Sequence, residues 1–178
     1  MNAGFDLAEA RALLARTPGA LRAWLGGLPD AWTRAVEAPG TWSAYDIVGH
    51  LVDGERHDWI PRARIILEHG TARPFELFDR ERHRSRPDET LLARLDELAV
   101  LRRDNLAALD ALAIGPGQLE RRGVHPRFGE VTLEQLLATW VAHDLDHLYH
   151  VARIMARRYT DATGPWIEYL RVLRPGAS

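Results

Sequence analysis

The chain of 178 residues contains neither cysteine nor lysine. The absence of cysteine excludes disulfides, zinc sites built from thiolates and a cysteine nucleophile. The absence of lysine means that all 23 basic residues are arginines, and they are interleaved with 25 acidic residues to give a formal net charge of −2. This balance gives no electrostatic reason to expect nucleic acid as a partner.

Long apolar runs are also absent. No segment approaches the roughly 18 consecutive apolar residues of a membrane span, so no membrane partner is predicted. The first residues, Met-Asn-Ala-Gly-Phe-Asp, show no basic region followed by an apolar run, so we expect no signal peptide. These features predict a soluble cytoplasmic protein. The 46% hydrophobic and 27% charged residues suit a single domain over residues 1–178.

Hydrophobic residues recur with helical spacing over nearly the whole chain. Residues 6–16 form a short helical segment. Thr17 as a cap and Pro18 as the first helical residue predict the start of a second segment, which Gly26-Gly27 ends or distorts. The two segments could equally be one helix kinked at Pro18.

A long helix is expected to begin at Ser43, where Asp46 imitates a capping box. This helix should reach about residue 68, with a kink near Pro61 because proline disturbs a helix interior. Residues 70–87 are rich in arginine, proline and charge. They predict an irregular crossover to the next helix.

The rest of the chain supplies two more long helices. The first runs from about Asp88 to a stop at Gly115-Pro116-Gly117, and an extended stretch from Leu119 to Val131 follows it. The second runs from the capping box of Thr132 and Gln135 to about Arg158. A brief final helix extends from Gly164-Pro165 to Leu173. Four long amphipathic helices with one long crossover predict an all-α four-helix bundle with short extra helices.

Three histidines fall on the inner faces of two of these helices. His143 and His147 are four residues apart, so their side chains project from one helix face, which continues an apolar stripe that includes Trp140. His50 lies on a similar stripe with Ile47. An unpartnered imidazole is costly in a core. We therefore expect the three histidines to share one divalent metal ion, with a coordination position open to water or substrate.

A His-x-x-x-His pair alone is weak support for a metal, and hydrogen-bonded core histidines without a metal are the alternative. His150, three residues after His147, is the next candidate for a ligand or a group that lines the site. His57 follows His50 by seven residues, which span roughly 10.5 Å of helix and separate the two too far for one ion. Glu55 is a candidate base.

The remaining polar candidates are assigned by position. His69, His83 and His125 fall near element ends or loops, where surface positions are expected. The crossover around Phe75, Phe78 and His83 is expected to line a pocket over the ion. Four acids are expected either to orient the imidazole N–H groups or to be solvated helix-face charges: Asp46, Asp53, Asp144 and Asp146.

Other enzyme classes fail on specific residues. A ferritin-like di-iron bundle needs Glu-x-x-His pairs, which do not occur in the helices that carry the histidines. A zincin would show His-Glu-x-x-His, whereas here Asp144 takes the place of the glutamate after the first histidine. The chain also has no nucleotide-binding glycine loop and no Gly-x-Ser-x-Gly elbow.

Two sequence blocks resemble the DinB/YfiT-like family of metal-dependent enzymes, which is distinct from the DNA polymerase that shares the DinB name. The first block runs from Thr41-Trp-Ser43 into His50-Leu-Val-Asp-Gly-Glu55. The second runs from Phe128-Gly-Glu-Val-Thr-Leu-Glu-Gln-Leu-Leu137 into Trp140-Val-Ala-His-Asp-Leu-Asp-His147. The resemblance spans about Thr17 to Arg158, in the order that the family shows.

The resemblance implies a bundle with a long crossover and a divalent metal, zinc or nickel, bound by a triad that maps onto His50, His143 and His147. It also implies a homodimer and a small-molecule substrate. The family often has glutamine where this chain has His150, so the role of that residue is open. Relatives include transferases and isomerases that use low-molecular-weight bacterial thiols.

For this chain the resemblance slightly favours a transferase that uses a small bacterial thiol. Because the chain has no cysteine, such a thiol must come from outside. A metal-dependent hydrolase and a non-catalytic metal-binding or ligand-binding stress protein are the alternatives. A solvent-open position on the metal would favour catalysis, and a closed shell of four protein ligands would favour a structural role.

Overall fold

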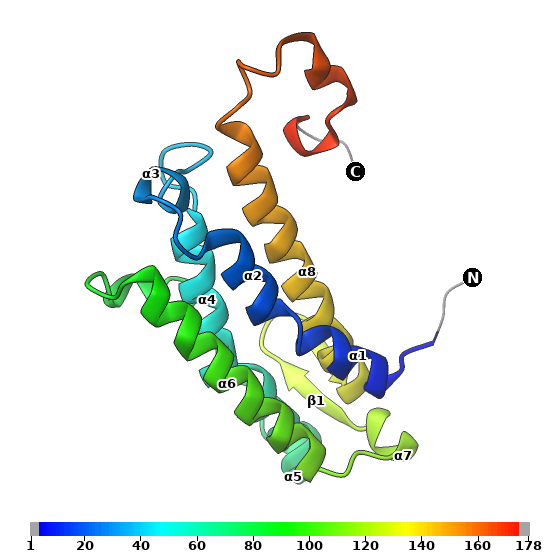
Figure 1. Ribbon diagram of the computed structural model, residues 1–178. Coiled ribbons are helices and arrows are strands. Elements are labelled where there is room, and N and C mark those ends of the chain that lie inside the picture. Colours follow the sequence, from blue (N-terminus) through cyan, green and yellow to red (C-terminus); the bar gives the residue numbers. More distant parts are fainter. Residues whose placement is uncertain (1–3, 175–178) are drawn as a thin grey trace.

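Four helical rods lie side by side in the computed structural model, which describes residues 4–174 (Figure 1). The rods are α1 (Leu7–Leu14) with α2 (Thr17–Leu25), α4 (Ala44–His57) with α5 (Trp59–His69), α6 (Leu91–Ala111), and α8 (Leu133–Arg157). The shorter elements are α3 (Asp30–Thr33), η1 (Gly70–Ala72), η2 (Arg82–Ser85), α7 (Pro116–Leu119), β1 (Arg122–His125), β2 (Gly129–Thr132), η3 (Gly164–Tyr169) and η4 (Arg171–Leu173). The prediction of an all-α four-helix bundle is confirmed.

The rods do not alternate in direction. The α4–α5 rod and α6 run the same way, whereas the α1–α2 rod and α8 run the opposite way (Figure 1). Two successive rods that run in parallel cannot be joined by a tight turn, so the chain needs a long connection between them. Residues 70–90 provide it, with only the short η1 and η2 along the way. The predicted irregular crossover is therefore confirmed.

Capping boxes fix the starts of the two helices that carry the three histidines. The Ser43 hydroxyl accepts from the backbone N–H of Asp46, whose carboxylate accepts from the Ser43 N–H at 2.9 Å. Thr132 and Gln135 make the same reciprocal pair at the start of α8. Both boxes were predicted, because they depend only on residues three apart.

The kink predicted near Pro61 is a complete break at Asp58, three residues before the proline. Asp58 separates α4 from α5 and has φ −111° and ψ −76°. Pro61 then becomes the third residue of α5. The N–H groups of the first helical turn have no partner within the helix, so a proline in this position removes no hydrogen bond. The helix therefore breaks three residues earlier, and the ordinary first turn of α5 contains the proline.

Other helix ends also differ from the sequence prediction. Thr17 is the first residue of α2 rather than its cap, and no side chain caps that helix. The third long helix, predicted from about Asp88, begins after Thr90, whose hydroxyl accepts from the Ala93 N–H. The final helix is the pair of 3-10 turns η3 and η4. The extended stretch before α8 forms a hairpin in which Val124 pairs with Glu130.

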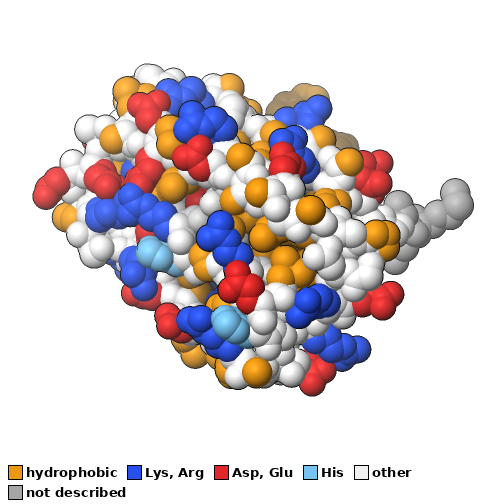
Figure 2. Space-filling view, turned by 90° about the horizontal axis from the view of Figure 1, so that it is seen from below, with side chains coloured by type: hydrophobic (Ala, Val, Ile, Leu, Met, Phe, Trp, Pro, Cys, Tyr) orange, Lys and Arg blue, Asp and Glu red, His pale blue; other side chains and the backbone are white. Residues whose placement is uncertain are grey.

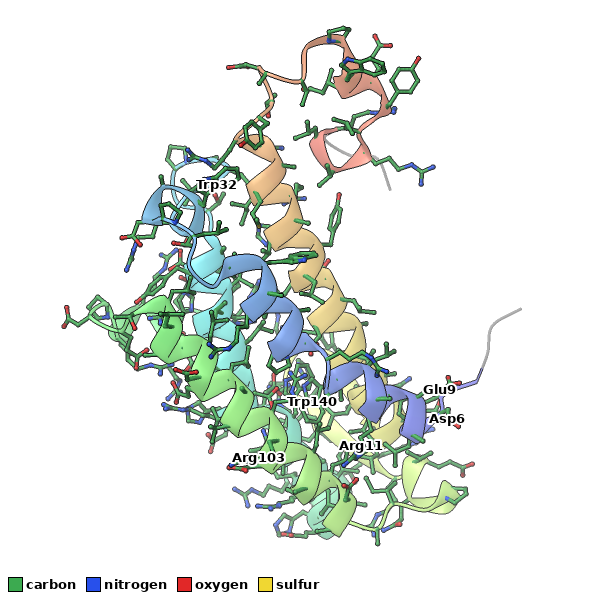
Figure 3. All side chains as sticks on the ribbon, viewed as in Figure 1. Asp6, Glu9, Arg11, Trp32, Arg103 and Trp140 are labelled. Carbon is green, nitrogen blue, oxygen red and sulfur yellow. The ribbon has the colours of Figure 1, made fainter. Side chains whose placement is uncertain are left out.

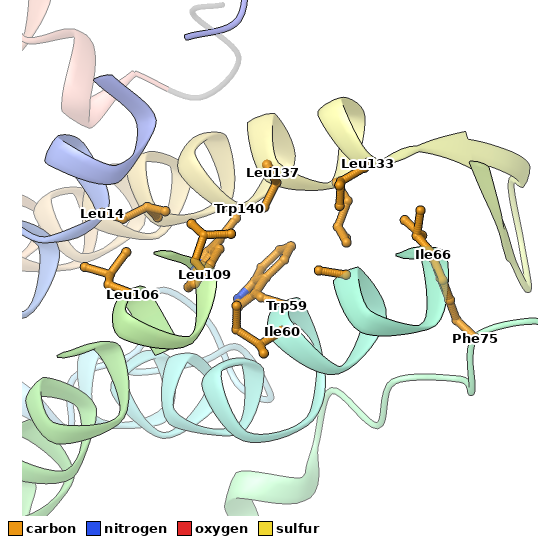
Figure 4. Packing of buried hydrophobic residues seen from close by; sticks show 12 residues of the cluster. Leu14, Trp59, Ile60, Ile66, Phe75, Leu106, Leu109, Leu133, Leu137 and Trp140 are labelled. Atoms are coloured by element: carbon orange, nitrogen blue, oxygen red, sulfur yellow. The ribbon is translucent and has the colours of Figure 1, made fainter. Parts of the chain in front are cut away.

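The core has two apolar clusters. One surrounds Trp59 and Trp140, whose rings stack with centroids 5.7 Å apart (Figure 4). The other contains Ile47 and Leu51 of α4 and Ile154 of α8. Between the clusters, α4, α6 and α8 carry a polar layer, which consists of His50, Glu55, Arg102, His143, Asp144 and His147. No helix in residues 4–174 is both long enough and apolar enough to span a bilayer.

Candidate metal centre

The side chains of His50, His143 and His147 converge in the polar layer. His50 comes from the middle of α4, and the other two come from successive turns of α8. The Nε2 atom of His143 lies 3.1 Å from Nε2 of His50 and 3.1 Å from Nε2 of His147. The three ligand atoms lie within 4.8 Å of one another, and no other trio of His, Asp or Glu converges in this way within residues 4–174.

Hydrogen bonding alone does not account for this arrangement. A ring nitrogen carries either a proton or one lone pair, so Nε2 of His143 makes at most one good hydrogen bond with its two neighbours. Tetrahedral ligands at the usual Zn–N length of 2.0–2.1 Å stand about 3.3 Å apart. The two distances from Nε2 of His143, both 3.1 Å, are close to that value. Three lone pairs directed at one cation therefore fit the geometry better.

The three imidazoles are also unprotonated at neutral pH. Burial, reinforced by the other two histidines, lowers the pKa of His50 to about 2. Burial and the neighbouring His147 lower the pKa of His143 to about 3. Burial lowers the pKa of His147 to about 4, against the opposing effect of Asp146. A metal ligand must be unprotonated, and these side chains meet that requirement at neutral pH.

The four acids expected as partners of the imidazole N–H groups do not contact them. The Nδ1 atoms of all three histidines are buried without a hydrogen-bond partner in the protein. Asp144 binds Arg102 at 2.6 Å, Asp53 binds Arg86 at 2.8 Å, and Asp46 binds Ser43 in the capping box. The fourth acid, Asp146, is exposed. Of the two roles left open for these acids, that of orienting an imidazole is filled by none of them, because closer arginine and serine groups occupy three of the carboxylates. Asp146 is a solvated helix-face charge.

Two tryptophans flank the triad. The ring of Trp42 lies 4.6 Å from that of His50 and 6.1 Å from that of His147, between centroids. Trp59 meets His143 edge to face at 5.1 Å. These large rings restrict the rotation of the imidazoles, so packing rather than hydrogen bonding orients the triad.

A pocket of about 400 Å³ opens from the triad. Its lining includes the three histidines, the start of α5, the crossover and the β1–β2 turn: His50, Gly54, Asp58, Trp59, Arg62, Leu77, Phe78, Arg80, His125, Pro126, Arg127, Phe128, His143, Asp146 and His147. The crossover was predicted to contribute through Phe75, Phe78 and His83. Of these, only Phe78 lines this pocket. Phe75 lines an adjoining apolar pocket that His143 also borders.

The helix break places a carboxylate in the pocket. Asp58 is 8% exposed, and its Oδ1 lies 2.7 Å from Nη1 of Arg62, one turn further along α5. Burial raises the pKa of the Asp58 carboxyl to about 6, and the Arg62 charge opposes this shift. The same Oδ1 has no well-oriented hydrogen bond. Sequence reasoning missed Asp58, although the preference of Pro61 for a first turn was a usable signal.

Glu55, the base suggested by sequence, faces away from the pocket. It accepts from Nε and Nη2 of Arg102 at 3.0 and 2.6 Å, and from the indole N–H of Trp140 in the bundle centre at 3.1 Å (Figure 3). Asn105 donates to its second oxygen. The suggestion is therefore wrong, because Glu55 belongs to a closed ion-pair network. Burial raises its pKa, although Arg102 opposes the change.

His83, expected at the surface, is fully buried. Its ring packs edge to face on Trp42 at 5.2 Å and lies 6.4 Å from the ring of His50. Gly49 makes room for it, since a Cβ there would be 2.9 Å from the Cβ of His83 and 2.2 Å from Nη1 of Arg94. The glycine immediately before His50 was a signal that something packs closely against this helix face.

The other histidines lie outside the triad. His150 is partly buried, with Nε2 3.6 Å from a carboxylate oxygen of Glu37, so the structure gives it no ligand position. His125 lines the pocket from the end of β1. His57 borders a separate crossover pocket, and His69 is exposed at the end of α5.

The fold and the sequence were both compared with those of known proteins. A solved structure, YfiT from Bacillus subtilis, superposes with a TM-score of 0.75 and 21% sequence identity, covering 89% of this chain and 92% of that one. YfiT is described as a probable metal-dependent hydrolase with an unusual four-helix bundle topology. A search of curated proteins gave no match. The family model of the DinB superfamily matches residues 13–151, which include all three histidines. The chain belongs to the DinB superfamily.

Proposed function

We propose that the protein is a metal-dependent hydrolase of small molecules, in which His50, His143 and His147 hold one divalent cation. The observation that carries this proposal is the convergence of three neutral Nε2 atoms beside a pocket that also contains a buried carboxylate. Three nitrogen ligands suit zinc, and nickel also accepts imidazole. When bound, the metal would act as a Lewis acid and lower the pKa of water at its open position toward about 7.

The side chain of Asp58 supplies the proton acceptor that hydrolysis needs. A water that attacks an ester or amide must give up a proton, and Asp58 presents a carboxylate to the same pocket. With a pKa of about 6 it is mostly ionised at neutral pH, yet more basic than an exposed aspartate. Arg62 holds it in place at 2.7 Å and keeps the pKa from rising further.

A thiol transferase is the second candidate, and its support is the resemblance together with a pocket large enough for an external thiol. Asp58 separates the two reactions. A thiol that coordinates a metal is deprotonated outright, so it needs no carboxylate base, whereas a water nucleophile does. The description of YfiT as a probable hydrolase adds support for the first candidate.

A purely structural metal site fits less well. It would need a fourth protein ligand, and in the described part of the chain only three such groups converge. His150, the candidate for that place, is turned to Glu37. The pocket above the triad therefore has space for a substrate at the remaining position.

We also propose a homodimer, as the family resemblance implies. Large apolar side chains on the outside of α8 and beyond it offer surface for a second copy: Leu145, Tyr149, Trp166 and Tyr169. Light scattering on eluted protein should report twice the 20.1 kDa of one chain. A mass of a single chain at micromolar concentration would contradict this proposal.

The function is tested with zinc-loaded protein on a panel of 4-nitrophenyl esters, in parallel with chloro-dinitrobenzene and a panel of bacterial thiols. We expect ester cleavage that His50→Ala abolishes. Asp58→Asn should reduce cleavage by about 10²–10⁴-fold, with metal content unchanged. Asp104→Asn, at an exposed carboxylate on α6 outside the pocket, is the matched control.

The alternatives predict different results. Thiol-dependent turnover that survives Asp58→Asn, without ester cleavage, would establish the transferase in place of the hydrolase. No turnover on either panel, with metal bound, would leave a binding protein.

A further inference from the structure

Two arginines at the pocket have no acidic partner among residues 4–174. Arg80 comes from the crossover and Arg127 from the turn between β1 and β2, and neither side chain forms an ion pair or a hydrogen bond with the described protein groups. The third arginine of the pocket, Arg62, is bound to Asp58 and donates to the backbone oxygen of Glu76. Both side chains are exposed to solvent, and both border the pocket beside the histidine triad.

The position of Arg80 relates it directly to the triad. Its guanidinium carbon lies 5.3 Å from the ring centroid of Trp42, the same ring that packs on His50 and His147. A guanidinium over an indole face is held by cation–π attraction and keeps its N–H donors free at its edge.

Arg127 lies beside apolar and aromatic side chains that border the pocket. Its backbone N–H donates to Nδ1 of His125 at 3.1 Å, and the His125 ring stacks on Phe128 with centroids 4.4 Å apart. Phe128 is 77% exposed, and Leu77 on the crossover is 71% exposed. Large exposed apolar side chains that border a pocket often mark a ligand surface. The pocket mouth thus combines apolar side chains with two free guanidinium groups.

The charge balance of the pocket favours an anion. Three arginines face two acids, Asp58 and Asp146, and Asp58 is already neutralised by Arg62. That leaves Arg80 and Arg127 against the single carboxylate of Asp146. Figure 2 shows arginine and acidic side chains interspersed on the face that it views. The whole chain has a formal net charge of −2, so the excess at the pocket does not reflect a basic protein. Such a field concentrates anionic ligands.

We infer that the pocket binds a small organic anion with an apolar body, whose carboxylate or phosphate is held by Arg80 and assisted by Arg127. The planar fork of arginine pairs with either group through two parallel hydrogen bonds. The apolar body would lie against Phe128 and Leu77, and the pocket volume of about 400 Å³ suits a ligand of this size. Binding of this anion does not depend on the proposed hydrolase function, whereas its role as the substrate does.

The test is calorimetric binding of phenylacetate, phenyl phosphate and the neutral isostere phenylacetamide, each to zinc-loaded and to metal-free protein. We expect at least one of the anions to bind about tenfold or more tightly than the amide, in both metal states. Arg80→Gln should remove most of that difference, and Arg127→Gln a smaller part. Arg64→Gln, at an exposed arginine of α5 outside the pocket, should change nothing. The preferred anion then distinguishes a carboxylate ligand from a phosphate ligand.

Equal affinity for the anions and the amide would overturn the inference. An anion that binds only zinc-loaded protein and is indifferent to Arg80→Gln would overturn it as well, because the ligand would then be bound through the metal alone. Neither result affects the ester test of the hydrolase. Conversely, anion binding that depends on Arg80 in a protein without turnover would support the anion site and reject the enzyme.

Discussion

The polar layer has two halves that both contain side chains of α4 and α8 but differ in how their polar atoms are satisfied. Arg102 is 2% exposed, and its five N–H donors bind Glu55, Asp144 and the backbone oxygen of Leu14. One turn away, His50 and the α8 histidines leave all three Nδ1 atoms without protein partners, and their Nε2 atoms crowd together.

This difference separates a structural polar group from a binding site. A buried network whose donors and acceptors all match can hold helices together without any ligand. Buried nitrogens that face one another gain their compensation only when a cation arrives. The Arg102 network should therefore affect stability whether or not metal is present, and the histidine triad should affect it differently in the two states.

The largest effect is expected from Arg102→Met. The substitution removes the cation but leaves Glu55 and Asp144 buried beside each other. Losing one partner of a buried ion pair costs about 3–5 kcal/mol. Urea unfolding should show this loss equally with zinc and with a chelator.

Arg103→Met is the matched control for that prediction, because the neighbouring side chain is 71% exposed and pairs only with exposed Asp104. It should change the free energy of unfolding by less than about 0.5 kcal/mol. A loss in Arg102→Met that appears only when zinc is present would show that the two halves of the layer are not independent.

A somewhat smaller effect should appear in acid, in the metal-free protein. The pKa values of about 2, 3 and 4 for His50, His143 and His147 lie below the 6.5 of an unfolded histidine. The unfolded chain therefore binds more protons below pH 6.5, so stability is full above that pH and falls as the pH drops toward the folded values. Three histidines should together lose about 3 kcal/mol between pH 6.5 and pH 5.5.

This pH dependence is measured as the free energy of urea unfolding across that window. His50→Gln should flatten the slope by about one proton relative to the wild-type chain. Parallel curves for the two proteins would mean that His50 is not held neutral by burial.

The smallest of the three effects concerns metal linkage. A ligand that binds only the folded chain stabilises it by about 2.7 kcal/mol at a hundredfold excess over its Kd. His143→Ala should lose this increment when zinc is present and much less after chelation. His69→Ala, at an exposed histidine on α5, should behave like the wild-type protein in both conditions. Equal losses for His143→Ala with and without metal would assign His143 to packing alone.

Sequence reasoning succeeded where the signal was local or periodic. The capping boxes at Ser43 and Thr132 involve residues three apart. The triad was found because helical periodicity places His143 and His147 on one face and the apolar stripe turns both of them inward. His50 joined them because its own stripe also faced the core.

Several failures at the site share one cause, which is that the decisive partner lies far away in the chain. Asp144 was expected at an imidazole, but Arg102 reaches it from α6, 42 residues earlier. Arg102 itself fills a gap in the leucine stripe of α6 between Leu98 and Leu106, a position that a charged residue occupies only when it is paired. The gap was visible, but the partners were not. The same holds for His83, which only the fold brings against Trp42.

The central claim, a divalent cation on the three histidines, is tested most directly by the metal content of protein prepared without an affinity tag or a nickel column. Elemental analysis should find one zinc or nickel ion per chain, or the metal-free protein should take up one equivalent of Zn²⁺ or Ni²⁺ in calorimetry. His50→Gln, His143→Gln and His147→Gln should each lose that ion, while the Arg103→Met control keeps it. Protein that is isolated without metal and takes up neither ion would contradict the account.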